Sequence, residues 1–339
     1  MYSVNGELMT PSPKLILSTV MLLTAPLAMA AEPPVTPVQM ITAFENVFGV
    51  HKGERRNHTK GSCATGEFVG LDAAQPYTRS ALFSGQTLPV IARFSLGGGN
   101  PQSPDTAKSA RSMSLQFTLP EGQLHHMAML NIPISGAATP QTFFDDLVAK
   151  APDATTGQPD PELIKAFKAT HPDSLPLAEY LTTYMPPSSW ANSRYYGVHT
   201  FKFINSDDKT SLVRWRFEPQ DGVQDLTEEQ RQQLPANFLD QRLIDRLEQG
   251  PVRWNMILSL GVEGDPETNA TLLWPSHREE VTVGTLTLTT ATAQKGAACE
   301  TINFDPLIMT DGIAPTDDPV LLFRSPAYAV SFGKRLSGQ

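Results

Sequence analysis

The sequence predicts a single α+β domain. Short runs of β-branched and aromatic residues between glycine and proline residues are typical of strands, and they occupy the first and last parts of the chain. Segments with apolar residues at helical spacing occupy the middle. The 339 residues contain no internal repeat, low-complexity tract or evident linker, so one domain is the simplest organisation.

Residues 1–30 are expected to be a signal peptide, which leaves residues 31–339 as the folded domain. Lys14 precedes an apolar run from Leu15 to Leu27, and Ala28-Met29-Ala30 ends it with the small-x-small pattern of a cleavage site. The run is too short to span a bilayer, and a retained anchor is the alternative. We therefore expect a periplasmic protein, in a Gram-negative host, without a stable membrane anchor.

The charge of the chain argues against a nucleic acid or an anionic membrane surface as its partner. Acidic residues number 35 against 26 Lys and Arg, which gives a net charge of −9, and no basic block occurs. Phosphate backbones and anionic lipids attract basic surfaces. A small-molecule substrate or cofactor is the better expectation.

Two cysteines, Cys63 and Cys299, occur in the chain. Their spacing is neither that of a zinc site nor that of a redox CxxC motif. An exported protein can form disulfides, but distance in sequence does not say whether two Cα atoms come within bonding range. Whether these cysteines pair stays open, and neither is a candidate for chemistry.

The first mature segment is predicted to be an amphipathic helix followed by strands. Residues 37–50 place Met40, Ile41 and Phe44 at helical spacing. Runs rich in β-branched and aromatic residues, bracketed by glycine and proline, then predict three strands. These cover residues 89–95, 112–119 and 124–130.

The middle of the chain is predicted to be helical, with a strand pair at its end. The helices are separated by proline-bearing loops and should cover residues 142–149, 161–169 and 177–184. The strand pair is predicted at residues 200–205 and 211–218, around the turn residues Asn205-Ser206-Asp207-Asp208.

The last third carries clear helix signals and further strands. Thr227 with Gln230 forms a capping-box pattern, and Pro235 should end that helix before a second one over residues 237–248. β-branched residues predict strands at 252–260 and 281–288. The final predicted helix covers residues 318–336, with prolines at 319 and 326.

Several polar motifs do not indicate chemistry. His125 and His126 are adjacent, so on a strand they would point to opposite faces and share no metal. We expect them, like His277, at the surface. The run Gly97-Gly98-Gly99-Asn100 completes no nucleotide-binding motif, and a plain turn is expected there.

Two residues stand out through the segments that accompany them. His58 lies in Arg55-x-x-His58-x-Lys60-Gly61, and Tyr328 ends Arg324-x-x-x-Tyr328. From about His51 to Leu336, the order of such segments resembles the catalase family, and within it the short secreted catalase-related peroxidases. The other segments include Arg93-Phe94-Ser95, Arg111 to Phe117, Asn131-x-Pro133, Tyr196-Gly197-Val198-His199-Thr200-Phe201-Lys202, Trp274-Pro275 with Val283-Gly284-x-Leu286-x-Leu288, Phe304-Asp305-Pro306 and Gly312-Ile313-Ala314-Pro315.

The resemblance implies an antiparallel β-barrel with flanking helices. The chain ends shortly after Tyr328, so the C-terminal helical domain of large catalases is expected to be absent. That absence removes any basis for expecting NADPH or an interlocked tetramer. A monomer or homodimer is expected.

The same resemblance implies that the protein binds haem b, with the iron held by the phenolate of Tyr328. Arg324, one helical turn earlier, is implied to bond to the phenol, and His199 and Asp318 to extend this network. A guanidinium fork suits the haem propionates. The matching positions are Arg55, Arg93 and Arg335.

On the peroxide side of the haem, the resemblance implies that His58 moves a proton between the two peroxide oxygens. Asn131 is implied to donate its amide to the peroxide, and Ser95 to orient His58 through its other ring nitrogen. Asn57 and Thr59 replace apolar residues of large catalases, so a more polar pocket is expected.

The implied function is a peroxidase that reduces hydrogen peroxide or an organic hydroperoxide at the expense of a small organic electron donor, in peroxide defence. Residues 134–138 lack the aromatic pair of large catalases, and a more open pocket favours organic donors. Catalase turnover, a hydroperoxide isomerase and a non-catalytic haem-binding envelope protein are the alternatives. A mere carrier has no use for an acid-base group such as His58.

Overall fold

The computed structural model describes residues 1–6 and 34–339. The predicted signal peptide therefore lies almost entirely outside the described residues. Two compact units are distinguished, Met1–Pro34 and Val35–Gln339, and the helices and strands described below belong to the second. Among the described residues, no helix is both long and apolar enough to cross a membrane.

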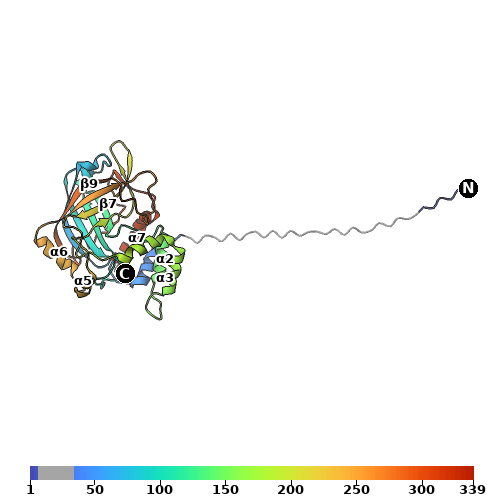
Figure 1. Cartoon of the computed structure of the whole chain (residues 1–339), viewed down its shortest axis with the longest axis horizontal. Helices are drawn as coiled ribbons and strands as arrows, with labels where there is room; N and C mark the ends of the chain where they lie inside the picture. The colour runs from blue at the N-terminus through green and yellow to red at the C-terminus, as the bar shows by residue number, and fades with distance from the viewer. Residues whose placement is uncertain (7–33) are drawn as a thin grey trace. The chain divides into compact units, whose positions relative to one another are not determined.

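Eight antiparallel strands of the second unit close into a barrel (Figure 1). They are β1 (Gly61–Gly70), β2 (Thr87–Leu96), β3 (Arg111–Thr118), β4 (Leu124–Leu130), β5 (Tyr195–Tyr196), β7 (Thr210–Pro219), β8 (Val252–Leu260) and β9 (Glu280–Ala293). The order is β7, β5, β4, β3, β2, β1, β9 and β8, which pairs back with β7. β6 (Phe201–Ile204) and β10 (Ile313–Pro315) extend the sheet from β7. The implied barrel is thus confirmed.

The sequence analysis missed β1, although this strand pairs with both β2 and β9. Its glycines break the β-branched pattern by which the other strands were predicted. A Cβ atom at Gly66 would lie 2.0 Å from the carbonyl oxygen of Thr287, beside a bulge in the pairing with β9. The close approach of the two backbones therefore requires glycine at this position.

The two faces of β2, β3 and β4 carry different side chains. Side chains alternate between the faces of a strand, and one face buries large residues such as Phe94, Met113 and Met129 in the barrel core. The other face carries several short side chains beside larger ones such as Arg93 and Leu130. The short side chains are Ser95, Ser112, Ser114 and Ala128. Because these side chains are short, they leave a recess along the sheet.

The predicted helices are confirmed, and those that bound the recess come from distant parts of the chain. Helices α1 (Pro37–Phe48), α2 (Pro140–Lys150) and α7 (Pro319–Leu336) share an apolar cluster that includes Ile41, Phe44 and Ala327. α3 (Pro161–Thr170) and α4 (Leu175–Thr183) follow α2 in the chain. α5 (Glu228–Gln233), which has the predicted capping box, and α6 (Leu239–Glu248) lie elsewhere on the barrel (Figure 1).

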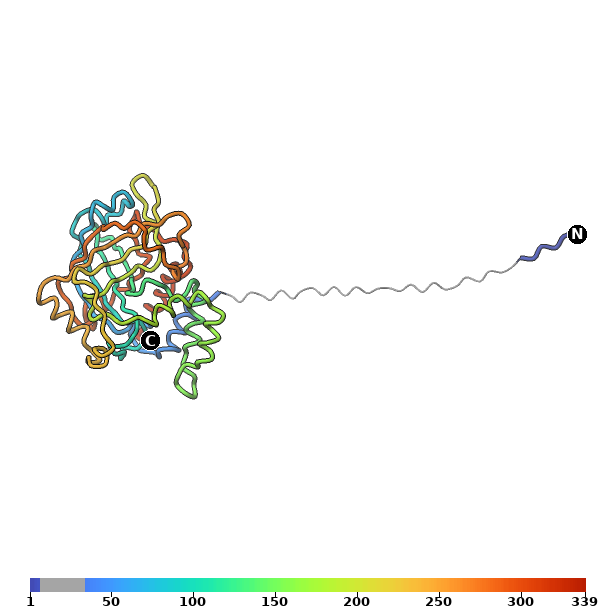
Figure 2. The backbone as a smooth tube through the Cα atoms, in the orientation of Figure 1, coloured from blue at the N-terminus to red at the C-terminus, as the bar shows by residue number. Residues whose placement is uncertain are grey.

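The chain ends beside the segment that leads into β1 (Figure 2). The carbonyl oxygen of Gln339 accepts hydrogen bonds from Arg56 Nη2 at 2.7 Å and from Gly53 N at 3.4 Å. Arg56 also donates to Glu45 Oε1 on α1 at 2.8 Å. These contacts fix the end of α7 against the loop that carries His58.

Candidate active site

A cavity of about 380 Å³ lies between the short-side-chain face of β2–β4 and helices α1, α2 and α7. Its wall is largely apolar and includes Ile41, Phe44, Leu130, Ile132, Phe143, Val198, Phe323 and Ala327. Most of the predicted site residues also line it, namely Arg55, His58, Arg93, His199, Arg324, Tyr328 and Arg335. An apolar cavity with a few convergent polar groups is typical of a cofactor or small-molecule site.

Tyr328 lines the cavity from α7, and Arg324 lies one helical turn before it. Arg324 Nη2 donates to Tyr328 Oη at 2.8 Å. Pro326 lies between the two residues without interrupting the helix, contrary to the distortion that a proline can cause. The guanidinium charge can therefore stabilise negative charge on the phenol oxygen.

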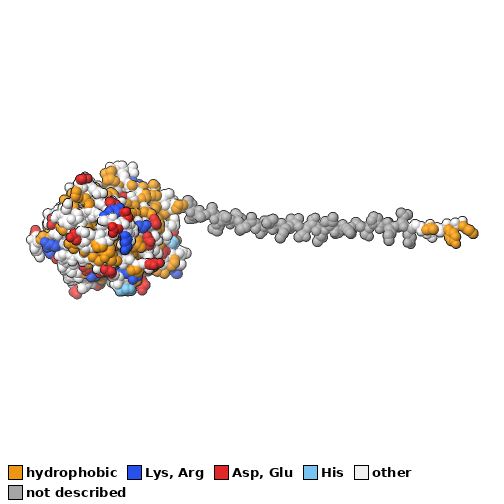
Figure 3. All heavy atoms as spheres, turned by 90° about the horizontal axis from the view of Figure 1, so that it is seen from above, with side chains coloured by type: hydrophobic (Ala, Val, Ile, Leu, Met, Phe, Trp, Pro, Cys, Tyr) orange, Lys and Arg blue, Asp and Glu red, His pale blue; other side chains and the backbone are white. Residues whose placement is uncertain are grey.

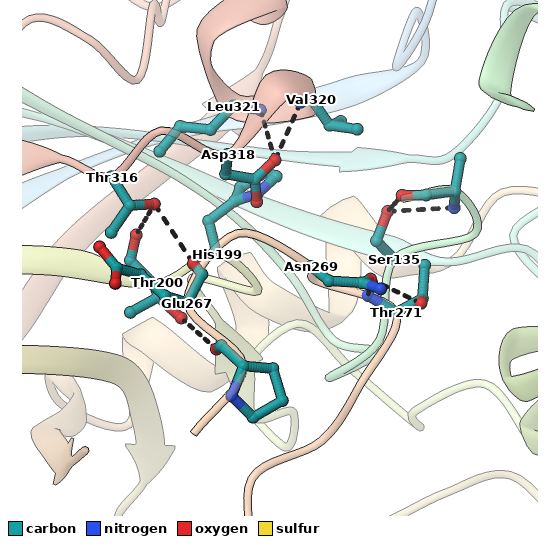
Figure 4. Close-up of polar contacts among 12 residues, drawn as sticks. Ser135, His199, Thr200, Glu267, Asn269, Thr271, Thr316, Asp318, Val320 and Leu321 are labelled. Carbon is teal, nitrogen blue, oxygen red and sulfur yellow. Dashed lines mark hydrogen bonds and ion pairs between the residues drawn. The ribbon is translucent and has the colours of Figure 1, made fainter. Parts of the chain in front are cut away.

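His199 and Asp318 form a buried pair at the start of α7 (Figure 4). His199 Nδ1 lies 2.8 Å from Asp318 Oδ2, and Asp318 Oδ1 accepts from the backbone N–H groups of Val320 and Leu321. Asp318 is therefore the N-cap of α7 and also the partner of His199. Burial lowers the pKa of His199, so a neutral ring with Nδ1–H toward Asp318 is favoured.

His58 lines the cavity from the loop before β1. Its backbone φ of 55° lies in the left-handed region, and its Nδ1 lies 3.3 Å from Ser95 Oγ on β2. Burial, followed by the charges of Arg93 and Arg324, lowers the pKa of His58 to about 3. The ring is therefore neutral near pH 7 and can accept a proton.

Arg55, Arg93 and Arg335 form a cationic cluster in the cavity wall. Burial is the main cause that lowers the pKa of Arg55 to about 9, and the charge of Arg335 is the next. Burial, followed by the charges of Arg55 and Arg335, also lowers the pKa of Arg93. Buried like charges require a compensating anion, so this cluster suits a ligand with carboxylates.

A loop after β9 holds two of these arginines in place. Arg55 Nη2 donates to the carbonyl oxygens of Cys299, Glu300 and Ile302 at 2.9–3.1 Å. Arg335 Nη1 donates to the carbonyl oxygen of Glu300 at 2.8 Å. A disulfide joins Cys299 to Cys63 on β1, with the Cα atoms 5.6 Å apart. The two cysteines therefore pair, which the sequence alone left open.

Asn131 is not among the residues that line the cavity, and the role predicted for its amide stays a prediction. Asn131 Oδ1 accepts from Arg111 N at 2.7 Å, and its Nδ2 donates to Tyr184 Oη at 3.0 Å. Asn131 directly follows β4, and the residues on either side of it, Leu130 and Ile132, line the cavity.

The surface position predicted for His125 and His126 is wrong, whereas His277 is exposed as predicted. Both rings are buried, on opposite faces of β4. His125 Nδ1 accepts from Thr310 N at 3.2 Å, and His126 packs against Phe304. The loop at 304–310 therefore covers this strand.

Within residues 1–6 and 34–339, no group of three or more His, Cys, Asp or Glu side chains could hold a metal ion.

The sequence analysis also missed residues that shape the cavity. Ser112, Ser114 and Ala128 line it, whereas Asn57, which also lines it, was expected in the pocket from the sequence. The available signal was the alternation of short with large side chains in two neighbouring predicted strands. That pattern indicates a face against which a flat ligand can lie. The chain bends at residues 97–99, where a turn was predicted. Gly98 N in this segment donates a hydrogen bond to Asn57 Oδ1.

Comparisons with known proteins agree with this arrangement. A family model described as "Catalase" matches residues 39–339. A "Catalase-related peroxidase" of Synechococcus elongatus is 54% identical over 304 residues, which cover 90% of each chain. Another of the same description, from Mycolicibacterium paratuberculosis, is 33% identical and covers 87% of this chain and 93% of that protein.

Longer catalases share the fold. Catalase A from Saccharomyces cerevisiae superposes with a TM-score of 0.77 at 23% identity, covering 84% of this chain and 62% of that chain. A bacterial catalase gives 0.76 at 23% identity and covers 96% and 67%. The "Catalase" of Schizosaccharomyces pombe is 28% identical, and the match covers 61% of its length.

Proposed function

The chain belongs to the catalase family, and from this premise we propose that it is a haem b peroxidase. As a member of that family with catalase-related peroxidases as relatives, it is an oxidoreductase that acts on peroxide. The proposal adds that it reduces hydrogen peroxide or an organic hydroperoxide, that it oxidises a small organic donor, and that the reaction serves peroxide defence.

The observation that carries the proposal is that one cavity contains both His58 and Tyr328. The neutral imidazole of His58 lies in the cavity wall on the loop before β1. The phenol of Tyr328, which accepts a hydrogen bond from the guanidinium of Arg324, lies on α7. An iron ligand and a separate acid-base group are the two elements that a haem peroxidase needs. A haem carrier needs only the first.

The residues of the cavity fit haem. Tyr328 would hold the iron, and Arg55, Arg93 and Arg335 would pair with the propionates, which supply the missing anions. Short side chains on β3 and β4 leave a flat wall for the macrocycle. When bound, the haem supplies the redox chemistry, and the protein supplies position and protons.

His58 would accept a proton from one oxygen of the peroxide and return it to the other, so that water can leave. Because its pKa is low, the ring is available as a base over the whole neutral range. Ser95 Oγ, 3.3 Å from Nδ1, would hold the ring so that Nε2 faces the peroxide.

The cavity wall supports a small organic donor as reductant. Ser135, Gly136 and Leu177 line the cavity next to α2, and no aromatic side chain occurs at residues 134–138. Short and apolar groups at this position leave room for an apolar donor.

We also propose the periplasm as the site of action. The predicted leader supports export, and the disulfide Cys63–Cys299 supports an oxidising compartment. Acidic and basic side chains are interspersed on the face shown in Figure 3, which supports small-molecule rather than nucleic-acid partners.

The test is an absorption spectrum of the haem-loaded protein, followed by hydrogen peroxide with an oxygen electrode and a chromogenic phenol present. A ferric tyrosinate spectrum with oxidation of the phenol and little oxygen would support the proposal. Vigorous oxygen release would identify a catalase instead. A haem spectrum that peroxide leaves unchanged would contradict an enzymatic role.

A further inference from the structure

Helices α1 and α2 contribute an apolar part of the cavity wall that contains one acidic side chain. The lining residues of the two helices are Met40, Ile41, Phe44, Pro140, Phe143 and Asp146. Pro140, Phe143 and Asp146 lie three residues apart, so they share one face of α2. Asp146 therefore presents its carboxylate to the cavity beside the ring of Phe143.

The charged groups of the cavity are separated by sign. Among the described residues that line it, Asp146 is the only acidic one, and the arginines come from the loop before β1, from β2 and from α7. The propionates of a bound haem would neutralise the cluster of Arg55, Arg93 and Arg335. The α2 part of the wall therefore suits a cation better than an anion.

Asp146 has a basic neighbour on its own helix. Lys150 Nζ lies 2.6 Å from Asp146 Oδ2, and the exposed fractions of the two side chains are 50% and 27%. A pair exposed to this degree contributes about 0–1 kcal/mol. Within the described part of the chain, no hydrogen bond is made to Asp146 Oδ1. The carboxylate can therefore accept a second cation, one that enters from the cavity.

We propose that Phe143 and Asp146 bind the organic electron donor, and that the preferred donor is an aromatic compound with a protonated amine on a short side chain. Its ring would pack on Phe143 and Phe44, whose ring centroids are 5.7 Å apart. Three residues span about 4.5 Å along a helix, which suits a ring and an ammonium joined by two carbon atoms. The inference rests on the proposed peroxidase function and names the substrate class of the same cavity.

Three phenols that differ in the charge of one group test the assignment. Near pH 7, tyramine has an ammonium, 4-ethylphenol is neutral and 4-hydroxyphenylacetate has a carboxylate, on side chains of similar length. Their dissociation constants from the ferric haem-loaded protein are measured without peroxide, by the paramagnetic relaxation of their ring protons. KM and kcat with hydrogen peroxide are measured in parallel.

Three substitutions isolate the carboxylate. Asp146→Asn removes the charge at constant size, and Asp146→Glu keeps it. Asp145→Asn is the matched control, because Asp145 is the preceding residue of α2, lies outside the cavity wall and contacts His171. The two Asn variants change the net charge equally, so an effect of net charge alone would occur in both. The haem content of each variant is measured as well.

We expect the unsubstituted protein to bind tyramine about fivefold more tightly than 4-ethylphenol, the effect of a partly exposed ion pair, and to bind 4-hydroxyphenylacetate most weakly. Asp146→Asn should bring tyramine and 4-ethylphenol within about twofold, through the dissociation constant and KM rather than kcat. Asp146→Glu and Asp145→Asn should keep the preference, and haem content should not change.

Three results would overturn the proposal: no preference for tyramine in the unsubstituted protein, a preference that persists in Asp146→Asn, or an equal loss in Asp145→Asn. Failure of the proposed function is a distinct result. If tyramine binds with the expected preference but none of the phenols is oxidised when peroxide is added, the peroxidase function fails and the binding site stands.

Discussion

Arg324 Nη2 and Tyr328 Oη are 2.8 Å apart on one face of α7, and Pro326 between the two residues does not interrupt the helix. Asp318, the N-cap of the same helix, is the hydrogen-bond partner of His199. One rigid element therefore carries the phenol, its cationic partner and the anchor of that network.

Tyr328→Phe should reduce haem retention at least tenfold, because the ring stays while the oxygen ligand is lost. The haem content of protein purified after loading measures this, with circular dichroism to confirm that the barrel is intact. Tyr180→Phe, on α4 and outside the cavity wall, is a matched control that should retain haem. Unchanged haem content and spectrum in Tyr328→Phe would remove Tyr328 from the proposed role.

His58→Ala should leave haem bound but slow the reaction with peroxide by about 10²- to 10⁴-fold, the usual contribution of a general acid-base group. Stopped-flow absorbance after mixing with hydrogen peroxide gives the rate. His277→Ala, an exposed histidine, is the control. A rate in His58→Ala equal to that of the unsubstituted protein would refute the mechanism.

Asp318→Ala should lower the free energy of unfolding by about 2–4 kcal/mol, because it removes the N-cap of α7 and leaves a buried histidine without its partner. Asp160→Ala removes only an N-cap, that of α3, and should cost about 1 kcal/mol. Urea unfolding of both variants measures the difference. Equal losses would show that the pair with His199 contributes nothing to stability.

Removal of the disulfide by Cys63→Ser with Cys299→Ser should lower the free energy of unfolding by about 2–5 kcal/mol. It should also speed the loss of haem, because the loop at 299–302 supplies the carbonyl oxygens that hold Arg55 and Arg335. Transfer of haem to an excess of apomyoglobin gives the rate. A rate unaffected by the substitution would mean that the loop holds its conformation without the disulfide.

The protein should lose stability on mild acidification. Burial lowers the pKa of His58 and His125 to about 3 and that of His126 to about 4, whereas an unfolded histidine titrates near 6.5. Between these values the unfolded chain binds more protons, so the free energy of unfolding falls as the pH falls from about 6.5 toward 4. Urea titrations of the apoprotein at several pH values test this. His126→Gln should reduce the slope, and His277→Gln should not.

Local signals in the sequence determined much of this protein. The capping residue Asp318, the i,i+4 spacing of Arg324 and Tyr328, and the apolar periodicity of α1 each act within a few residues. The helices could therefore be predicted, with ends that differ from the observed ones by about two residues at most. The strands with β-branched residues were predicted for the same reason. β1 was not predicted. Its glycines are required by the close approach of the backbone of β9, which lies more than two hundred residues away in the chain.

The tertiary structure alone decided which face of each strand meets the cavity. Successive side chains of an extended chain point to opposite faces. Leu130 therefore lies in the cavity wall, whereas the side chain of Asn131, the next residue, accepts a hydrogen bond from Arg111 N. The burial of His125 and His126 depends on a loop that folds back over β4, and the bond between Cys63 and Cys299 depends on two distant segments meeting. Sequence patterns report on neighbours along the chain, whereas these contacts arise between segments that only the closed barrel brings together.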